Sequence, residues 1–158
     1  MNQIINLIWI TLLPFLELRA SIPYGILFTS LKWYWVFIIC VITNILLAPI
    51  LWLFLKYILF FVLKIRFIKR LYIKTITKVH RKVHHYIDRY GTLGLAIFIG
   101  IPLPGSGVYS GALAAYILGF KFKDYLIASI IGVLIAATIV TIVVVTGDQV
   151  FMHWFVKG

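Results

Sequence analysis

Three long runs without a charged residue are the feature that most restricts how this chain can fold. They cover residues 33–55, 90–120 and 125–147 and contain 23, 31 and 23 residues. About 20 apolar residues in a helix cross a hydrocarbon core of roughly 30 Å. Because 63% of the residues are hydrophobic and 12% are charged, the sequence predicts an all-α integral membrane protein. The runs are apolar on every side, which excludes a soluble α/β enzyme, a disordered tail and a transmembrane barrel.

Two of the apolar segments carry helix breakers near their middle. Pro14, Pro23 and Gly25 surround the first interruption, and the second begins at Pro102 and extends towards Gly111. About ten apolar residues precede each interruption, and as a helix they rise about 15 Å, half of the hydrocarbon thickness. We therefore expect two re-entrant segments that enter the membrane, break and return, with four fully spanning segments as the alternative. Residues 33–55 and 125–145 are expected to span it, with Pro49 as a candidate kink.

The order of these segments forms an internal repeat. A single membrane domain, 1–158, is predicted to contain repeat 1 at 1–63, a cytoplasmic basic linker at 64–90 and repeat 2 at 91–158. Each repeat consists of a broken segment followed by a full span. An odd number of crossings per half gives the halves opposite orientations, so we expect the two inverted repeats found in many transporters.

Positive charge is concentrated in the linker. Ten of the 15 basic residues fall between Lys56 and Arg89, which favours a cytoplasmic face of the cell membrane and a multipass topology. Between Lys64 and Tyr90 apolar residues recur every three or four positions, as in an amphipathic helix on a membrane surface. We expect anionic inner-leaflet lipids to bind Lys64–Arg89 and no nucleic acid to bind, and we leave a homo-oligomer open.

The linker also carries a polar face with potential metal ligands. His80, His84 and Asp88 follow one another at intervals of four residues and could hold a metal ion. A solvated polar face is the commoner outcome for such a helix. We therefore predict no metal and no cofactor.

Glu17 and Arg19 are the strongest functional candidates. A charge at bilayer depth costs about 2.5–3.5 kcal/mol, so such residues usually line a cavity or form pairs. Two positions apart on a helix they would not face each other, which leaves Arg19 free for an external anion unless the backbone is extended there. The alternatives are a buried salt bridge or an Arg19 side chain that reaches the membrane surface. Glu17 is a candidate for proton coupling, because desolvation favours a neutral carboxyl group.

The second break is a candidate anion site. It contains Pro104, Gly105, Ser106 and Gly107. Proline and glycine disfavour a regular helix, and the glycines let backbone N–H groups approach an oxyanion at the start of the next helix. We predict that Arg19 and these residues form opposite walls of one substrate-binding site. The alternative is a break that serves only close helix packing.

Two motifs together carry a family resemblance. They read Pro14-x-x-Glu17-x-Arg19-x-x-Ile22-Pro23-x-Gly25 and, after the basic linker, Pro102-x-Pro104-Gly105-x-Gly107-x-x-x-Gly111. The combination resembles the small multi-drug export protein family, which is related to the DedA/VTT superfamily of membrane proteins. This resemblance implies paired re-entrant helices that meet at mid-membrane. It also implies functions linked to transbilayer lipid movement, including polyprenyl-phosphate recycling, to proton-motive-force maintenance and to drug tolerance.

Three functions follow as hypotheses. The first is a proton-coupled transporter or flippase for an anionic lipid or amphiphile such as a polyprenyl phosphate, with Arg19 and the second break holding the head group. The second is a proton-coupled exporter of cationic drugs at Glu17. The third is a membrane scaffold that does not transport. An enzyme is not expected, because no catalytic triad, carboxylate pair or metal signature lies at membrane depth.

Overall fold

The described part of the protein is built from helices. The computed structural model describes residues 3–14, 16–62, 91–103 and 106–156, and within these ranges it has no strand. The helices are α1 (Gln3–Leu12), α2 (Glu17–Phe28), α3 (Trp33–Val62), the helix Gly91–Gly100, α5 (Val108–Leu118) and α6 (Phe122–Val156). The all-α prediction is confirmed. The expected linker, with His80, His84 and Asp88, lies outside the described residues.

Local sequence explains the C-terminal ends of three helices. Helix α1 stops two residues before Pro14, and the helix Gly91–Gly100 stops two residues before Pro102, as expected because a residue before proline disfavours the helical conformation. Helix α5 ends at Leu118 and is capped by Gly119, whose φ of 76° is left-handed. The Gly119 N–H group donates to the carbonyl oxygens of Ala115 and Tyr116.

Three of the expected helix breakers do not break a helix. Pro23 and Gly25 lie inside α2 and Gly111 lies inside α5, so the prediction of breaks at these positions is wrong. A proline is tolerated inside an apolar helix when neighbouring groups bond the backbone carbonyl that is left without its N–H partner. The glycines serve packing instead: a Cβ on Gly25 would overlap Val36, and one on Gly111 would lie 2.5 Å from Ile99 Cγ1.

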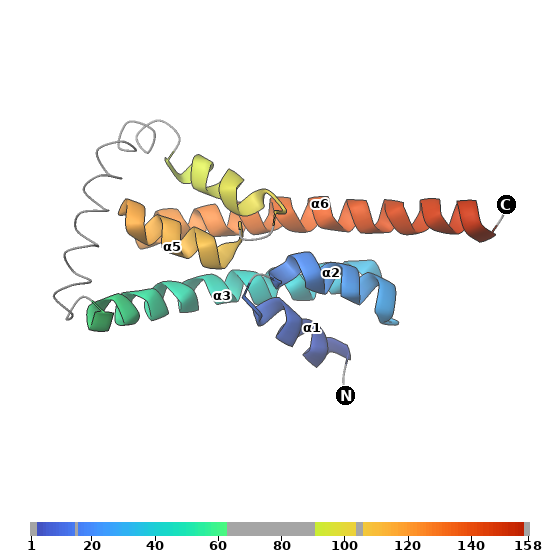
Figure 1. Cartoon of the computed structure of the whole chain (residues 1–158), viewed down its shortest axis with the longest axis horizontal. Coiled ribbons are helices and arrows are strands. Elements are labelled where there is room, and N and C mark those ends of the chain that lie inside the picture. The colour runs from blue at the N-terminus through green and yellow to red at the C-terminus, as the bar shows by residue number, and fades with distance from the viewer. Residues whose placement is uncertain (1–2, 15, 63–90, 104–105, 157–158) are drawn as a thin grey trace.

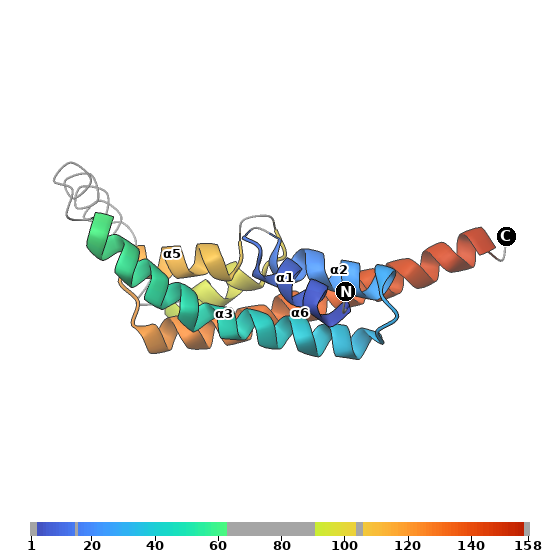
Figure 2. The same cartoon turned by 90° about the horizontal axis from the view of Figure 1, so that it is seen from below.

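Two helical hairpins approach each other beside two long antiparallel helices, which pack against each other. Helices α3 and α6 run in opposite directions, and α1 and α2 double back beside one half of them (Figure 1). The helix Gly91–Gly100 and α5 double back beside the other half, entering from the opposite end (Figure 2). Both views bring the turn after α1 close to the turn before α5. The two interruptions in the sequence therefore meet near the centre of the molecule.

The core consists of one face of each long helix packed against the hairpins. Close backbone approach is required at Gly132, where an added Cβ would lie 2.7 Å from the carbonyl oxygen of Ala96. Small residues at such contacts are typical of helices that associate inside a membrane.

The outer surface of the long helices is apolar. Leu46, Ile50 and Val143 are among the large hydrophobic side chains that are more than half exposed, an arrangement that suits lipid better than water. Trp33–Ile58 and Phe122–Gly147 are long and apolar enough to cross a membrane.

Candidate functional site

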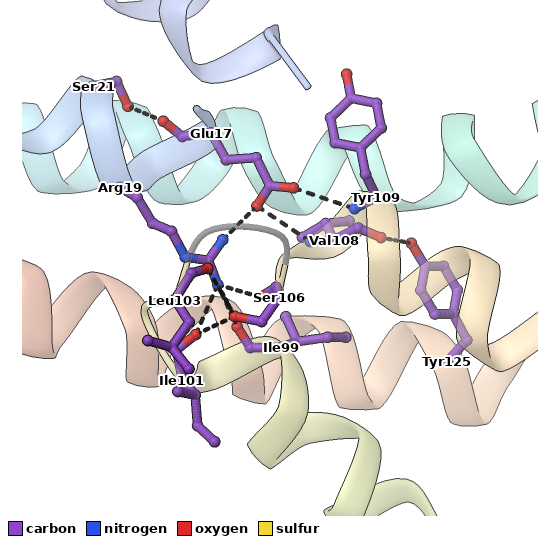
Figure 3. A network of polar contacts seen from close by, with 10 residues as sticks. All are labelled: Glu17, Arg19, Ser21, Ile99, Ile101, Leu103, Ser106, Val108, Tyr109 and Tyr125. Carbon is purple, nitrogen blue, oxygen red and sulfur yellow. Dashed lines mark hydrogen bonds and ion pairs between the residues drawn. The ribbon is translucent and has the colours of Figure 1, made fainter. Parts of the chain in front are cut away.

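The meeting point of the two hairpins holds a buried charged pair. Glu17 is the first residue of α2, and Arg19 follows it half a turn later. The Glu17 side chain is 2% exposed and that of Arg19 is 11% exposed. Both point from the first hairpin into the break of the second (Figure 3).

The Glu17 carboxylate binds the start of α5. Its two oxygens accept hydrogen bonds from the backbone N–H groups of Val108 and Tyr109, each at 3.2 Å. These N–H groups belong to the first turn of the helix, which has no partner for them within itself and carries partial positive charge. Glu17 therefore acts as the anion at this helix terminus.

Arg19 binds the C-terminal end of the helix Gly91–Gly100. Its Nη2 donates to the carbonyl oxygens of Ile99 at 3.1 Å and Ile101 at 3.0 Å, and to the carbonyl of Ser106. A helix C-terminus carries partial negative charge and carbonyls without partners, so a guanidinium group stabilises it. One pair of side chains from α2 thus compensates both helix ends at the second break.

The prediction that Glu17 and Arg19 would not face each other is wrong. Arg19 Nη1 lies 3.1 Å from Glu17 Oε2 and forms a salt bridge with it. The reason is local: Glu17 has a φ of +45°, the left-handed region, so the regular helical spacing does not apply at this residue. The buried salt bridge that the sequence left as an alternative is the arrangement found.

Gly107 lies directly against the Glu17 carboxylate. A Cβ at this position would overlap the Glu17 carboxylate, so only glycine lets the carboxylate reach the helix terminus. Ser106 lies beside Arg19, with its Oγ 3.2 Å from Nη2 and donating to the Ile101 carbonyl at 2.5 Å. Pro104 and Gly105 lie outside the described residues. The structure thus brings Arg19, Ser106 and Gly107 together, and substrate binding by them stays a prediction.

A cavity of about 260 Å³ opens beside the charged pair. Its lining includes Glu17, Arg19 and Gly107, together with Pro14, Tyr109, Ser110 and Leu113. Tyr109 was not anticipated from the sequence: besides its N–H contact to Glu17, its hydroxyl donates to the Leu12 carbonyl at the end of α1, at 2.5 Å. Its position two residues after Gly107 is the only signal that could have indicated it.

The register of α2 against α3 gives the depth of the site. Ser21 Oγ lies 3.2 Å from Cys40 Sγ, and Gly25 packs against Val36. These pairs are one helical turn apart in antiparallel helices, so the start of α2 lies near the level of Asn44 on α3. Residue 44 stands near the middle of the apolar stretch Trp33–Ile58. The charged pair on α2 therefore lies level with the middle of the apolar stretch of α3.

The family of this protein follows from a match over most of its length. The family described as "Putative small multi-drug export protein" matches residues 17–139, a range that contains Glu17, Arg19 and the whole second break. The chain belongs to the small multi-drug export protein family. With its two helices of membrane-spanning length, this member of the small multi-drug export family is a membrane protein, and the family description indicates a transporter.

No match to this chain is found among curated proteins or among solved structures. The relation to the DedA/VTT superfamily that the resemblance implies therefore stays a prediction.

Proposed function

We propose that this small multi-drug export family member is a multipass, proton-coupled transporter of amphiphiles with an anionic head group. The observation that carries the proposal is the setting of the Glu17 carboxylate. Its oxygens are held by three N–H donors, one from Arg19 and two from the start of α5, at the edge of a cavity. The same donors suit two oxygens of a phosphate or carboxylate head group.

Proton coupling follows from competition for these donors. A protonated Glu17 loses its attraction to Arg19 and to the α5 terminus, because both interactions depend on negative charge. The donors are then available to an external anion, and the apolar cavity wall suits the attached chain. Proton and anionic cargo would therefore occupy the site together, and loss of the proton would return Glu17 to its donors.

Alternating access to this site would rest on an inverted repeat, and the buried faces of α3 and α6 support one. Six of the seven buried residues described on α3 have a buried counterpart 89 positions later on α6. The pairs are Val36/Tyr125, Cys40/Ser129, Asn44/Val133, Leu47/Ala136, Ala48/Ala137 and Leu51/Val140. Because the two helices run in opposite directions (Figure 1), matching buried faces favour two halves of opposite orientation. We propose that each hairpin is re-entrant and that the site lies where they meet, as in transporters with broken helices.

Single-cysteine labelling tests this topology. In a Cys40→Ser background, Lys32→Cys and Gly119→Cys should react with a membrane-impermeant reagent from opposite sides, because α3 separates the ends of the two hairpins. Lys32 is expected outside and Gly119 on the side of the basic linker. Reaction of both positions from the same side would exclude the two inverted re-entrant hairpins.

Transport into liposomes tests the cargo and the coupling. Purified protein should move a labelled polyprenyl phosphate faster when a pH gradient is imposed, and Glu17→Gln should abolish this dependence because glutamine cannot exchange a proton. Asp124→Asn, which changes another carboxylate near the start of α6, is the matched control and should keep the pH dependence. An identical response to pH in wild type and Glu17→Gln would remove Glu17 from the coupling.

A cationic drug is the second candidate cargo. It is favoured by the family description and by the presence of the Glu17 carboxylate and the Tyr109 ring in the cavity lining, since aromatic faces and carboxylates both attract organic cations. A cationic dye in the same liposomes separates the two proposals. Exchange of dye for protons, without movement of the polyprenyl phosphate, would favour the cation exporter.

A further inference from the structure

Asn44 is a buried polar residue that the site described above does not use. It lies on the core face of α3 and is 0% exposed. Neither its Oδ1 nor its Nδ2 has a hydrogen-bond partner among the described residues. A buried amide without partners is costly, especially at membrane depth, so its presence calls for a partner in another state of the protein.

The helix register places this amide near the level of the start of α2. Val36 packs against Gly25, and Cys40 contacts Ser21 one turn later. Asn44 is one further turn along the same face of α3, and Glu17 is one further turn along α2. In this structure the Glu17 carboxylate points to α5 and not to α3 (Figure 3). Rotation about its side-chain bonds would bring it towards Asn44.

The chemistry of the two groups makes them complementary only after proton uptake. A neutral carboxylic acid has one O–H donor and one carbonyl acceptor, and a primary amide has the matching acceptor and donors. A carboxylate offers acceptors alone and would leave Oδ1 unpaired. We infer that Asn44 is a positioning residue that receives the protonated Glu17 carboxyl group after this group leaves Arg19 and α5. The inference rests on the proposed proton coupling and gives the protonated state a defined place.

The other charged or titratable side chains around Glu17 are each engaged in a contact of their own. Among the described residues, these are Arg19 on α2, Tyr109 on α5, Tyr125 on α6 and Cys40 on α3. Arg19 favours the carboxylate through the salt bridge. The Tyr125 hydroxyl bonds the Val108 carbonyl at 3.4 Å, and Cys40 bonds Ser21. Of the buried side chains with unpartnered polar atoms among the described residues, Asn44 alone is an amide, with a separate donor and acceptor for a neutral Glu17.

Removal of the amide should stabilise the resting protein while weakening the protonated state. Asn44→Leu replaces an unpaired buried amide by an apolar side chain of similar size, so its unfolding temperature in detergent should equal or exceed that of wild type. Asn44→Ala removes the amide without any risk of overpacking. Thr141→Val is the matched control, because Thr141 is also buried and its hydroxyl has no partner among the described residues. Thr141 lies farther along α6, nine residues beyond Gly132, the position at which α6 packs against the second hairpin.

Infrared difference spectroscopy in lipid provides a readout that does not depend on transport. The carbonyl band of protonated Glu17 is assigned as the band that Glu17→Gln removes. Both Asn44 variants should move the midpoint of its appearance to lower pH by about one unit, a tenfold weaker proton affinity, as expected for the loss of a buried hydrogen-bonded partner. They should also raise the band frequency, since the carbonyl loses a donor. Thr141→Val should change neither.

The outcomes separate this inference from the proposed function. An unchanged midpoint and frequency in both Asn44 variants would overturn the role of Asn44, even if transport remains coupled to protons through Glu17. A shifted band together with transport that ignores pH would support the Asn44 partnership and overturn the proposed coupling.

Discussion

Replacement of Arg19 by methionine is expected to destabilise the protein by about 3–5 kcal/mol, the usual cost of removing one partner from a buried ion pair. The loss has two sources. The Glu17 carboxylate keeps its charge in a buried position. The carbonyls of Ile99, Ile101 and Ser106 lose the hydrogen bond from Arg19, although the Ile101 carbonyl still accepts one from the Ser106 hydroxyl. Unfolding by sodium dodecyl sulfate in mixed micelles measures the change. The loss should shrink at low pH, because protonation neutralises the unpaired Glu17.

Two further variants show whether the pair acts as a unit. Arg19→Lys keeps the charge, but a lysine ammonium cannot bond Glu17 and several carbonyls at once as the planar guanidinium does. We therefore expect an intermediate loss of stability. The double variant Glu17→Gln/Arg19→Met should be more stable than Arg19→Met alone, because no unpaired charge remains buried. Strict additivity of the two single changes would contradict the coupling of Glu17 and Arg19.

The substitution Gly107→Ala is expected to have the second largest effect, a destabilisation of about 1–3 kcal/mol with loss of proton-coupled transport. The backbone is not the reason, since Gly107 has an extended conformation with a φ of −121° that alanine adopts. The added methyl group would overlap the Glu17 carboxylate and push it from the start of α5. Thermal unfolding in detergent and the liposome assay measure the two effects.

The steric explanation has a matched control and an internal test. Gly147→Ala adds the same methyl group where nothing lies within 4 Å and should change the stability by less than about 0.5 kcal/mol. In a Glu17→Ala background the obstacle is absent, so Gly107→Ala should cost little there. An equal cost of Gly107→Ala in both backgrounds would show that the position matters for a reason other than Glu17.

The sequence by itself determined the helical class, the positions of the long helices and the existence of two central interruptions. A single uncharged run of more than 20 residues can satisfy all of its own backbone groups inside a membrane only as a helix. Pro14 and Pro102 follow the ends of two short helices because proline restricts the residue before it. Pro23, Gly25 and Gly111 carried the same local signal without ending a helix. Neighbouring helices decide whether such a residue breaks a helix or allows close packing.

The tertiary structure decided what the charged residues do. Sequence spacing kept Glu17 and Arg19 apart, whereas the left-handed backbone at Glu17 brings them together. Their other partners lie 80 to 92 positions away along the chain, so no local pattern could predict that they compensate the two helix ends of the second break. The same holds for Asn44, whose level near the start of α2 follows only from the register of α2 on α3. Long-range contacts of this kind depend on how apolar faces pack, and many sequences with the same hydrophobic pattern would place these polar groups elsewhere.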